Sequence, residues 1–382
     1  MAWREVTRVW LREEFVNLAA QQGSNRRELC RRFGISAKTG YKWLKRYACD
    51  GRQGLEDRSR RPRRTPTRTA DDIEQAVIQL RLESRNCWGG RKLAHLIAAQ
   101  RSGPTPAPST VTGILRRAGL IDPNSASTPG PFKRFEREAP NQLWQMDFKG
   151  HFAMLSGGRC HPLTVLDDHS RFSLTLAACA DERLETVRQA LTATFRRYGL
   201  PAEMLMDNGP PWGSGSDNCF TMLGLWLIRL GIRIIHGRPY HPQTQGKDER
   251  FHRTLNFEVV RHFNFKNLQH CQREFDRFRD RYNLLRPHDA LQLATPVSRY
   301  CPSPLQFPES LPPIEYPPGL ELRKVQAEGW FSYCGRQFRV SKTLRGQPVA
   351  LQPDPDNPAR REVFFCSQPI AQIDLNQPDA RD

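Results

Sequence analysis

Several features that define common protein classes are absent from this chain of 382 residues. Its ten cysteines include no CxxC pair, which excludes a finger or ribbon built on paired thiolates and gives no disulfide framework. No run approaches the roughly 18 consecutive apolar residues of a membrane span, and residues 1–5 do not open an apolar signal segment. We therefore expect a soluble, cytoplasmic protein whose thiols are reduced and mostly buried.

Positive charge is abundant and unevenly distributed. The whole chain has a formal charge of +18 and a pI near 9.9. Residues 1–68 hold 18 Lys and Arg against 7 Asp and Glu, so most of the excess lies in the first sixth of the sequence. A basic excess of this kind indicates a polyanionic partner, most often nucleic acid or an anionic membrane surface.

Residues 1–50 have the spacing of three short helices. Apolar residues recur every three or four positions from residue 9 to 18, Asn25 opens a capping box, and Ser36 follows a glycine turn as the next N-cap. This pattern predicts a helix-turn-helix. Gly40 counts against the third helix, because glycine costs about 1 kcal/mol there relative to alanine. The expected core residues are Leu29, Phe33, Ile35, Trp43 and Leu44.

The exposed face of the third predicted helix is basic and suits phosphates and base edges. Its expected DNA contacts are Lys38, Thr39, Lys42, Lys45 and Arg46. Residues 51–68 form a basic linker, because their prolines and like charges disfavour a helix. The linker's candidate phosphate contacts are Arg58, Arg60, Arg61, Arg63 and Arg64. Two plainer interpretations stay open, a three-helix bundle that binds nothing and a solvated tether.

A second helical module is expected at residues 69–121. Ile73, Val77 and Leu80 are spaced by four and three, and Ser109 is the expected N-cap of the module's last helix. The order is again that of a helix-turn-helix, so two such modules could bind one long site. Residues 122–139, rich in Pro, Ser and charge, are expected to be a linker.

The periodicity changes near residue 140. Residues 184–198 place apolar side chains on one helical face, and a second helix is expected at residues 220–230. The expected strands are residues 143–148, 162–167, 171–177, 203–206 and 233–236. This order predicts an α/β core over residues 140–262 whose first three strands form an antiparallel meander.

Three carboxylates in this core could form one site. Asp147 and Asp207 lie at or near predicted strand ends, and Glu249 lies in a helix that opens after Gly246. If the apolar residues of that helix face the core, Asp248 points with them and Glu249 lies on another face. Carboxylates without thiolate or histidine partners make an oxygen site suited to Mg²⁺ or Mn²⁺, and two such ions about 3.5–4 Å apart can support phosphoryl transfer.

Several motifs in this region, taken in order, resemble those of a known family. They are residues 143–148 (LWQMDF), 166–171 (LDDHSR), 207–209 (DNG), 240–245 (YHPQTQ), 246–252 (GKDERFH), 282–283 (YN) and 286–288 (RPH). With the N-terminal helices and the linker segment 55–62, they resemble bacterial insertion-sequence transposases, whose catalytic core is similar to that of retroviral integrases. The resemblance covers most of the chain.

The resemblance implies a ribonuclease-H-like core and an acidic triad that corresponds to Asp147, Asp207 and Glu249. These residues would be both the catalytic residues and the ligands of Mg²⁺ or Mn²⁺, with two ions expected. Water would cleave a phosphodiester at the element end, and the freed 3′-hydroxyl would attack a second phosphodiester. That reaction needs no external energy source or nucleotide cofactor, and the sequence has no GxxxxGK[ST] phosphate loop.

The spacing of the triad departs from the family pattern. The positions of Asp207 and Glu249 differ by 42 residues, more than the family usually has, and we attribute the excess to a loop at residues 212–217. If Asp217 or Asp248 is the ligand instead, the assignment changes. Flanking residues are expected to hold the DNA backbone, although ordinary loop solvation is the alternative. They are His241, Gln243, Gln245, Lys247 and Arg250.

The C-terminal region combines helices, a linker and strands. The sequence predicts a helical extension at residues 263–300, a Pro-rich linker at residues 301–317 and a small β-barrel at residues 318–376. The resemblance also suggests such a barrel, with a role in DNA-end binding or subunit contact, or as a stabilising appendage.

The sequence therefore favours a multidomain, metal-dependent transposase that binds the ends of a mobile element and cuts and joins double-stranded DNA. We expect a homo-oligomer on DNA, because two ends must be handled together, and a bacterial, nucleoid-associated location without a membrane. The alternatives are a catalytically silent DNA-binding repressor derived from such an enzyme and a metal-dependent, structure-selective nuclease.

Overall fold

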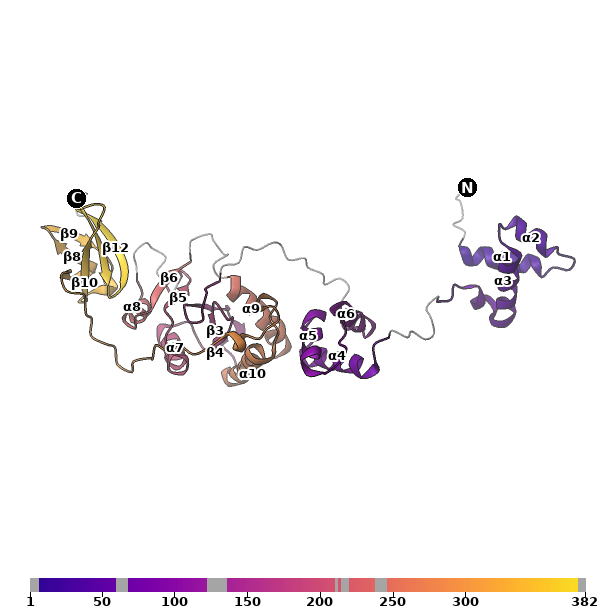
Figure 1. Cartoon of the computed structure of the whole chain (residues 1–382), viewed down its shortest axis with the longest axis horizontal. Helices are drawn as coiled ribbons and strands as arrows, with labels where there is room; N and C mark the ends of the chain where they lie inside the picture. Colours follow the sequence, from indigo (N-terminus) through magenta and orange to yellow (C-terminus); the bar gives the residue numbers. More distant parts are fainter. Residues whose placement is uncertain are drawn as a thin grey trace. The chain divides into compact units, whose positions relative to one another are not determined.

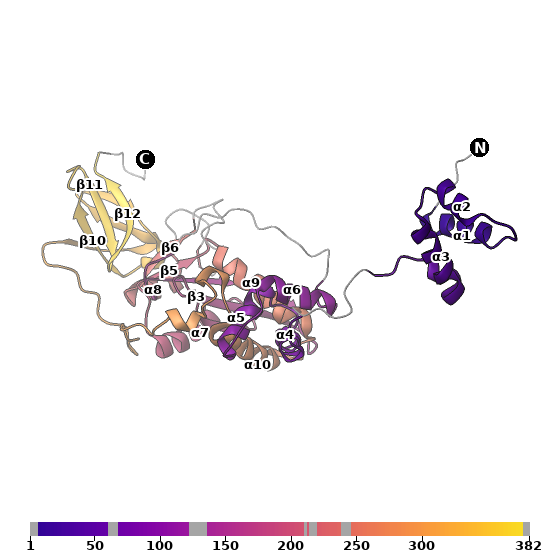
Figure 2. The same cartoon turned by 45° about the vertical axis from the view of Figure 1, so that its right-hand side comes forward.

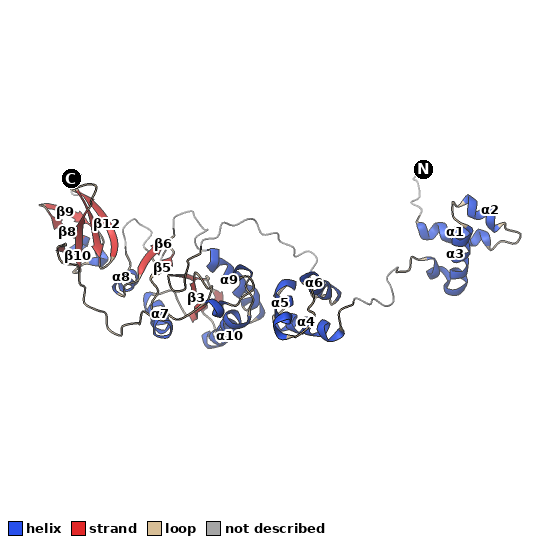
Figure 3. Ribbon diagram, in the orientation of Figure 1, coloured by secondary structure: helices blue, strands red, loops and turns tan. Residues whose placement is uncertain are grey.

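The computed structural model describes residues 7–59, 68–121, 136–209, 212–213, 220–237 and 246–376. The chain divides into two compact units, residues 1–68 and 69–382, and we describe each by itself. Every described element before the first strand is helical (Figure 3). Within these ranges no helix combines the length and the apolar character needed to cross a bilayer.

The first unit contains the predicted three helices (Figure 1). They are α1 (Arg8–Ala19), α2 (Arg26–Arg32) and α3 (Ala37–Asp50), followed by a 3₁₀ turn at Gly51–Leu55. The side chains of Asn25 and Ser36 accept hydrogen bonds from the backbone N–H groups of Glu28 and Thr39, respectively. Both predicted N-caps are therefore confirmed. The third helix runs three residues beyond the expected end at Tyr47.

Gly40 is a packing requirement of this unit rather than a defect of α3. A Cβ atom at position 40 would lie 2.5 Å from the Cys30 sulfur and 2.9 Å from the Phe15 ring, so only glycine lets α3 approach α1 and α2 this closely. Trp43 is buried as predicted, whereas Leu29, Phe33, Ile35 and Leu44 are only partly buried around it. The buried members of this core cluster also include Phe15, Val16, Cys30 and Leu55.

The second unit opens with another helical module. Its helices are α4 (Asp71–Glu83), α5 (Gly90–Gln100) and α6 (Pro108–Arg117), which enclose a core that includes Val77, Leu93 and Ile114. The prediction that Ser109 caps the last helix is wrong. Pro108 occupies the first helical position, and Ala107 is the N-cap, because the fixed φ of proline suits a helix start.

A six-stranded mixed sheet forms the centre of the second unit. Its strands are β1 (Leu143–Phe148), β2 (Phe152–Ala153), β3 (Arg159–Asp167), β4 (Ser173–Cys179), β5 (Glu203–Met206) and β6 (Arg233–His236). The order is β2-β3-β1-β5-β6, with β4 also paired to β3. The β1, β3 and β4 pairings are antiparallel, which confirms the predicted meander, and β5 pairs in parallel with β1 and β6.

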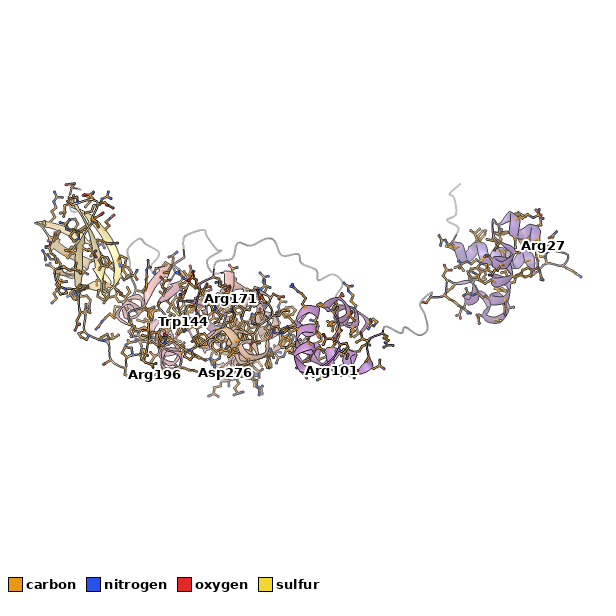
Figure 4. The ribbon with its side chains drawn as sticks, in the orientation of Figure 1. Arg27, Arg101, Trp144, Arg171, Arg196 and Asp276 are labelled. Atoms are coloured by element: carbon orange, nitrogen blue, oxygen red, sulfur yellow. The ribbon has the colours of Figure 1, made fainter. Side chains whose placement is uncertain are left out.

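Two pairs of helices cover this sheet (Figure 1). Residues of α7 (Leu184–Tyr198) and α8 (Met222–Arg229) belong to the same apolar cluster as Trp144 and Met146 of β1. Residues of α9 (Gly246–Glu258) and α10 (Leu268–Asp280) belong to a second cluster with Cys160, Leu166 and Leu176. Trp144 lies within the first of these two clusters, on the side of the sheet that α7 and α8 cover (Figure 4).

The predicted C-terminal β-barrel is not what the structure contains. A four-stranded antiparallel sheet has the order β12-β11-β10-β7, and β8 and β9 form a separate hairpin. Figure 2 labels β10, β11 and β12 of the larger sheet. Closure into a barrel needs hydrogen bonds between the outermost strands, but the sheets formed by the described residues stay open. The strands are β7 (Glu321–Lys324), β8 (Trp330–Tyr333), β9 (Arg336–Arg339), β10 (Pro348–Pro353), β11 (Arg360–Phe365) and β12 (Gln368–Asp374).

The cysteines in the described ranges are free thiols. The expectation that most are buried is wrong, because Cys49, Cys301 and Cys334 are exposed and two others are half-buried.

We predict that Leu255→Ala lowers the free energy of unfolding of the second unit by about 2–5 kcal/mol, because Leu255 is fully buried where α9 meets the sheet. Urea unfolding followed by circular dichroism measures the change. Thr254→Ala, at a half-buried neighbouring position on the same helix, should cost less than half as much. Equal losses for the two variants would mean that α9 is not anchored through its apolar face.

Candidate functional site

The alternation of β1 decides where Asp147 points. Trp144 and Met146 face α7 and α8, so Gln145 and Asp147 face the opposite side of the sheet, which α9 covers. The Asp147 side chain is 26% exposed, and its strand pairs at this position with Thr164 of β3. Asp147 therefore lies at the edge of the covered region, partly removed from water.

The pKa of Asp147 is raised from 3.8 to about 7. Burial is the main cause, and the negative charges of Asp207, Glu182 and Glu249 raise it further, against a backbone hydrogen bond that lowers it. Asp147 therefore lies close enough to Asp207 and to Glu249 for each of their charges to disfavour its ionised form.

Asp207 and Glu249 reach this region from separate elements. Asp207 directly follows β5, where its carboxylate accepts the N–H of Asn208 at 2.9 Å and its carbonyl lies 3.1 Å from Nδ1 of His236. Glu249 lies in the first turn of α9, and both residues are exposed. A central strand and a helix start therefore present the two side chains to solvent near Asp147.

The carboxylates are neighbours without forming a closed ligand set. Within the described ranges, no three or more His, Cys, Asp or Glu side chains are grouped as a metal site. In kind, however, the donors fit a hard divalent cation, because they are carboxylate oxygens whose mutual repulsion a cation would relieve.

Asp248, the alternative ligand considered from the sequence, has surroundings different from those of Glu249. It is fully buried, and neither carboxylate oxygen has a hydrogen-bond partner. Burial, followed by the charges of Asp147 and Asp168, raises its pKa well above 3.8. The helical spacing that predicted an inward orientation for this residue is confirmed, whereas Asp217 lies outside the described residues.

His252 joins α9 to the strand that carries Asp147. The Thr164 hydroxyl donates to the Asp147 carbonyl at 2.9 Å, so it accepts from Nε2 of His252 at 2.8 Å. Burial lowers the pKa of His252 to about 4, which keeps the ring neutral near pH 7. Its Nδ1 lone pair then faces the Asp147 carboxylate at 3.9 Å. In the sequence, His252 stands only within the motif at residues 246–252, and nothing in the pattern indicates this link to β1 and β3.

Asp168 is a buried acceptor that the sequence did not distinguish from its neighbour Asp167. Its carboxylate accepts from Nε2 of Gln145 at 2.7 Å and from the backbone N–H of Arg137 at 2.8 Å, and it forms an ion pair with Lys247. Lys247 was predicted to contact DNA, but its side chain is only 17% exposed and is directed toward Asp168. The structure thus places the Lys247 ammonium group against Asp168.

The other predicted DNA contacts divide into three groups. Lys38, Lys42, Lys45, Arg58 and Arg250 are exposed, and Thr39 and Arg46 are half-buried. Lys42 and Arg46 lie over the Trp43 ring at 4.2 and 5.1 Å, and Arg58 pairs with Asp50. Outside the described residues lie Arg60, Arg61, Arg63, Arg64, His241, Gln243 and Gln245.

Family models match most of these regions. An integrase core domain matches residues 137–242 and a second integrase core domain matches residues 230–296. A helix-turn-helix domain matches residues 11–63, and a homeodomain-like domain matches residues 39–115. The C-terminal domain of IS481 family transposases matches residues 320–381. The chain thus has helix-turn-helix domains followed by an integrase core of the ribonuclease-H-like kind.

Individual relatives agree with these matches. The chain is 27% identical over 235 residues to an uncharacterized 31.7 kDa protein of insertion element IS407 from Burkholderia multivorans, covering 59% of this chain and 81% of that protein. It is 29% identical over 151 residues to an uncharacterized 39.2 kDa protein of insertion element IS476 from Xanthomonas euvesicatoria, covering 40% of this chain and 42% of that protein. The chain is therefore similar to bacterial insertion-sequence transposases with an integrase-like core.

Among solved structures, a chain of the simian T-cell lymphotropic virus intasome, in complex with a PP2A regulatory subunit, is 17% identical. The match covers 77% of this chain and 99% of that chain, with a TM-score of 0.37. Such a score carries no structural argument, so the assignment rests on the family models and the insertion-element relatives.

We predict that two buried histidines make the second unit sensitive to acid. Burial lowers the pKa of His252 to about 4 and that of His288 to about 2, from 6.5. Because the fold favours their neutral forms, their contribution is complete above pH 6.5 and is lost as the pH falls toward these values. Each histidine should cost about 2 kcal/mol of unfolding free energy between pH 7.5 and 5. Urea unfolding at both pH values should show a smaller loss for His252→Asn/His288→Asn, and an unchanged loss would contradict the assignment.

Proposed function

We propose that this chain is a transposase that binds the ends of a mobile DNA element and performs divalent-metal-dependent strand cleavage and strand transfer. The observation that carries the proposal is the electrostatic coupling of Asp147 to Asp207 and Glu249. These residues fall within the two segments that match integrase core domains. The insertion-element relatives support the same class of activity.

Asp147, Asp207 and Glu249 are proposed as the catalytic residues and as the ligands of Mg²⁺ or Mn²⁺. Two such ions, when bound, would activate the attacking oxygen and stabilise the leaving oxygen of a phosphodiester. With its pKa raised to about 7, the Asp147 carboxyl group is only partly ionised near neutral pH, and metal binding would favour its ionised form. The neutral His252 ring is hydrogen-bonded to Thr164, and its Nδ1 lies 3.9 Å from the Asp147 carboxylate, so the ring lies beside the proposed ligand.

The helical modules are proposed to bind the element ends. α3 would lie on the duplex with Lys38, Lys42 and Lys45 exposed toward it. Element ends and target DNA would be the partners, and further copies of the chain would bring two ends together. A nucleoid-associated location in the bacterial cytoplasm follows from this role.

We predict that Asp147→Asn, Asp207→Asn and Glu249→Gln each abolish strand joining and leave end binding within about twofold. Each substitution removes a negative charge but keeps the side-chain size, so it removes a metal ligand with little change in shape. The substrate is a set of labelled duplexes cut from the DNA that flanks the coding sequence, incubated with Mg²⁺ or Mn²⁺ and resolved on denaturing gels.

The same assay separates the alternative functions. A transposase yields joined strands, a structure-selective nuclease yields cut strands alone, and a silent repressor yields a mobility shift without cutting. Asp276→Asn is a matched control, because Asp276 is a carboxylate of α10 (Figure 4) outside the proposed site. Full joining by any of the three triad variants would remove that residue from the assignment.

We predict that Lys38→Ala and Lys45→Ala each weaken duplex binding and reduce the slope of log affinity against log salt by about 1, since each would release about one counterion from a phosphate. Fluorescence anisotropy at several salt concentrations measures both quantities. Arg27→Ala on α2 (Figure 4) is the control, because Arg27 is exposed but lies outside the proposed recognition helix. An unchanged slope for both lysine variants would place the DNA on another face.

A further inference from the structure

Among the residues that the structure describes, the first turn of α9, which carries Glu249, has few contacts that hold it to the sheet. Gly246 has no side chain, Asp248 is buried without a hydrogen-bond partner, and Glu249 and Arg250 are exposed. The apolar contacts of this helix begin at Phe251. The backbone N–H groups of a first helical turn also lack partners within the helix, which makes this turn the part most prone to fray.

Lys247 supplies the missing attachment. Its ammonium group forms an ion pair with the carboxylate of Asp168 and also donates to the Asp168 carbonyl at 3.2 Å. Asp168 is fully buried, and its carboxylate accepts two further hydrogen bonds, from Gln145 and from the backbone of Arg137. A buried carboxylate with this many donors has one well-defined position, so it is a rigid anchor for the lysine.

The far end of this network lies on the strand that carries Asp147. Gln145 is buried on β1 two residues before Asp147 and on the same face of the sheet. The backbone N–H of Asp168 also donates to the Leu143 carbonyl of β1 at 2.9 Å. A continuous polar bridge therefore runs from Gln145 through Asp168 to Lys247, and each end lies two residues from a proposed metal ligand.

We propose that Lys247 and Asp168 are positioning residues, which hold the first turn of α9 so that the Glu249 carboxylate stays beside Asp147. This inference rests on the proposed function, because it assigns the pair a role toward the metal site of that function. It replaces the predicted contact of Lys247 with DNA.

Lys247→Met tests the proposal, since it keeps the length of the side chain and removes the charge. Manganese binding to the full chain, measured by isothermal titration calorimetry without DNA, should weaken by about 10-fold or more, as is usual for residues that support metal ligands. Hydrogen exchange should accelerate in the α9 peptide at residues 246–256 and not in α10. Affinity for the flanking-DNA duplexes should stay within about twofold of wild type.

Three further variants control for charge and folding. Lys247→Arg keeps a cation and should retain manganese affinity within about threefold. Lys247→Met/Asp168→Asn leaves no unpaired buried charge, so it tests the bridge even if the single variant unfolds, and it should lose manganese affinity as the single variant does. Lys266→Met makes the same substitution at an exposed site of the same unit and should match wild type.

The outcomes separate this inference from the function on which it rests. If wild type binds manganese no more tightly than Asp147→Asn or Glu249→Gln, the proposed metal site itself is wrong. If wild type binds manganese and both Lys247→Met and the double variant equal it, the positioning role is wrong. A loss of DNA affinity with unchanged manganese affinity and unchanged hydrogen exchange in α9 would indicate that Lys247 contacts DNA instead.

Discussion

The burial of Asp147 beside other carboxylates is the constraint on which the proposed site depends. Burial contributes most to the raised pKa of Asp147, and the charges of Asp207, Glu182 and Glu249 raise it further, so the fold holds this carboxyl group where its ionised form is disfavoured. The sheet imposes the proximity. β5 is paired on both sides, with β1 and β6, so Asp207 leaves the sheet beside Asp147. The apolar contacts of Phe251 and Leu255 hold α9 across the same strands. A divalent cation would relieve the repulsion. Folding therefore supplies in advance part of the free energy that is needed to bring these carboxylates together.

The core handles its buried carboxyl groups in two ways. Asp168 is surrounded by donors, from Gln145, Arg137 and Lys247, so its charge is matched by hydrogen bonds and an ammonium group. Among the residues that the structure describes, Asp248 has no hydrogen-bond donor, and burial raises its pKa well above 3.8. Asp248 belongs to the first turn of α9 and Asp168 pairs with Lys247 of that turn, and both carboxyl groups are buried. Of the two acidic residues in this turn, only Glu249 is exposed to solvent.

The sequence pattern predicted the elements whose structure is determined by interactions between residues close in sequence. The bounds of β1, β5, β6 and α7 match those expected from their periodicity and bounding turns. β2 escaped detection because two residues carry no periodicity, and the C-terminal barrel was wrong because closure depends on pairing between distant strands. The site divides in the same way. The inward orientation of Asp248 follows from helical spacing, whereas the partnership of Lys247 with Asp168 joins residues 79 apart in sequence and depends on tertiary packing.

Helical geometry nevertheless contained a signal for Lys247. Residues two apart on a helix point about 200° away from each other. A turn that presents Glu249 to solvent must therefore direct Lys247 to the opposite side. There the ammonium group would be buried, and a buried ammonium requires an anion. Asp168 is that anion. A carboxylate placed at a helix start, rather than on a strand, gains access to solvent but loses the hydrogen-bonded neighbours that fix a strand residue. The buried pair on the other side of the turn supplies the attachment that the helix start lacks, which is why we expect the geometry of Glu249 to depend on residues that never touch the reacting DNA.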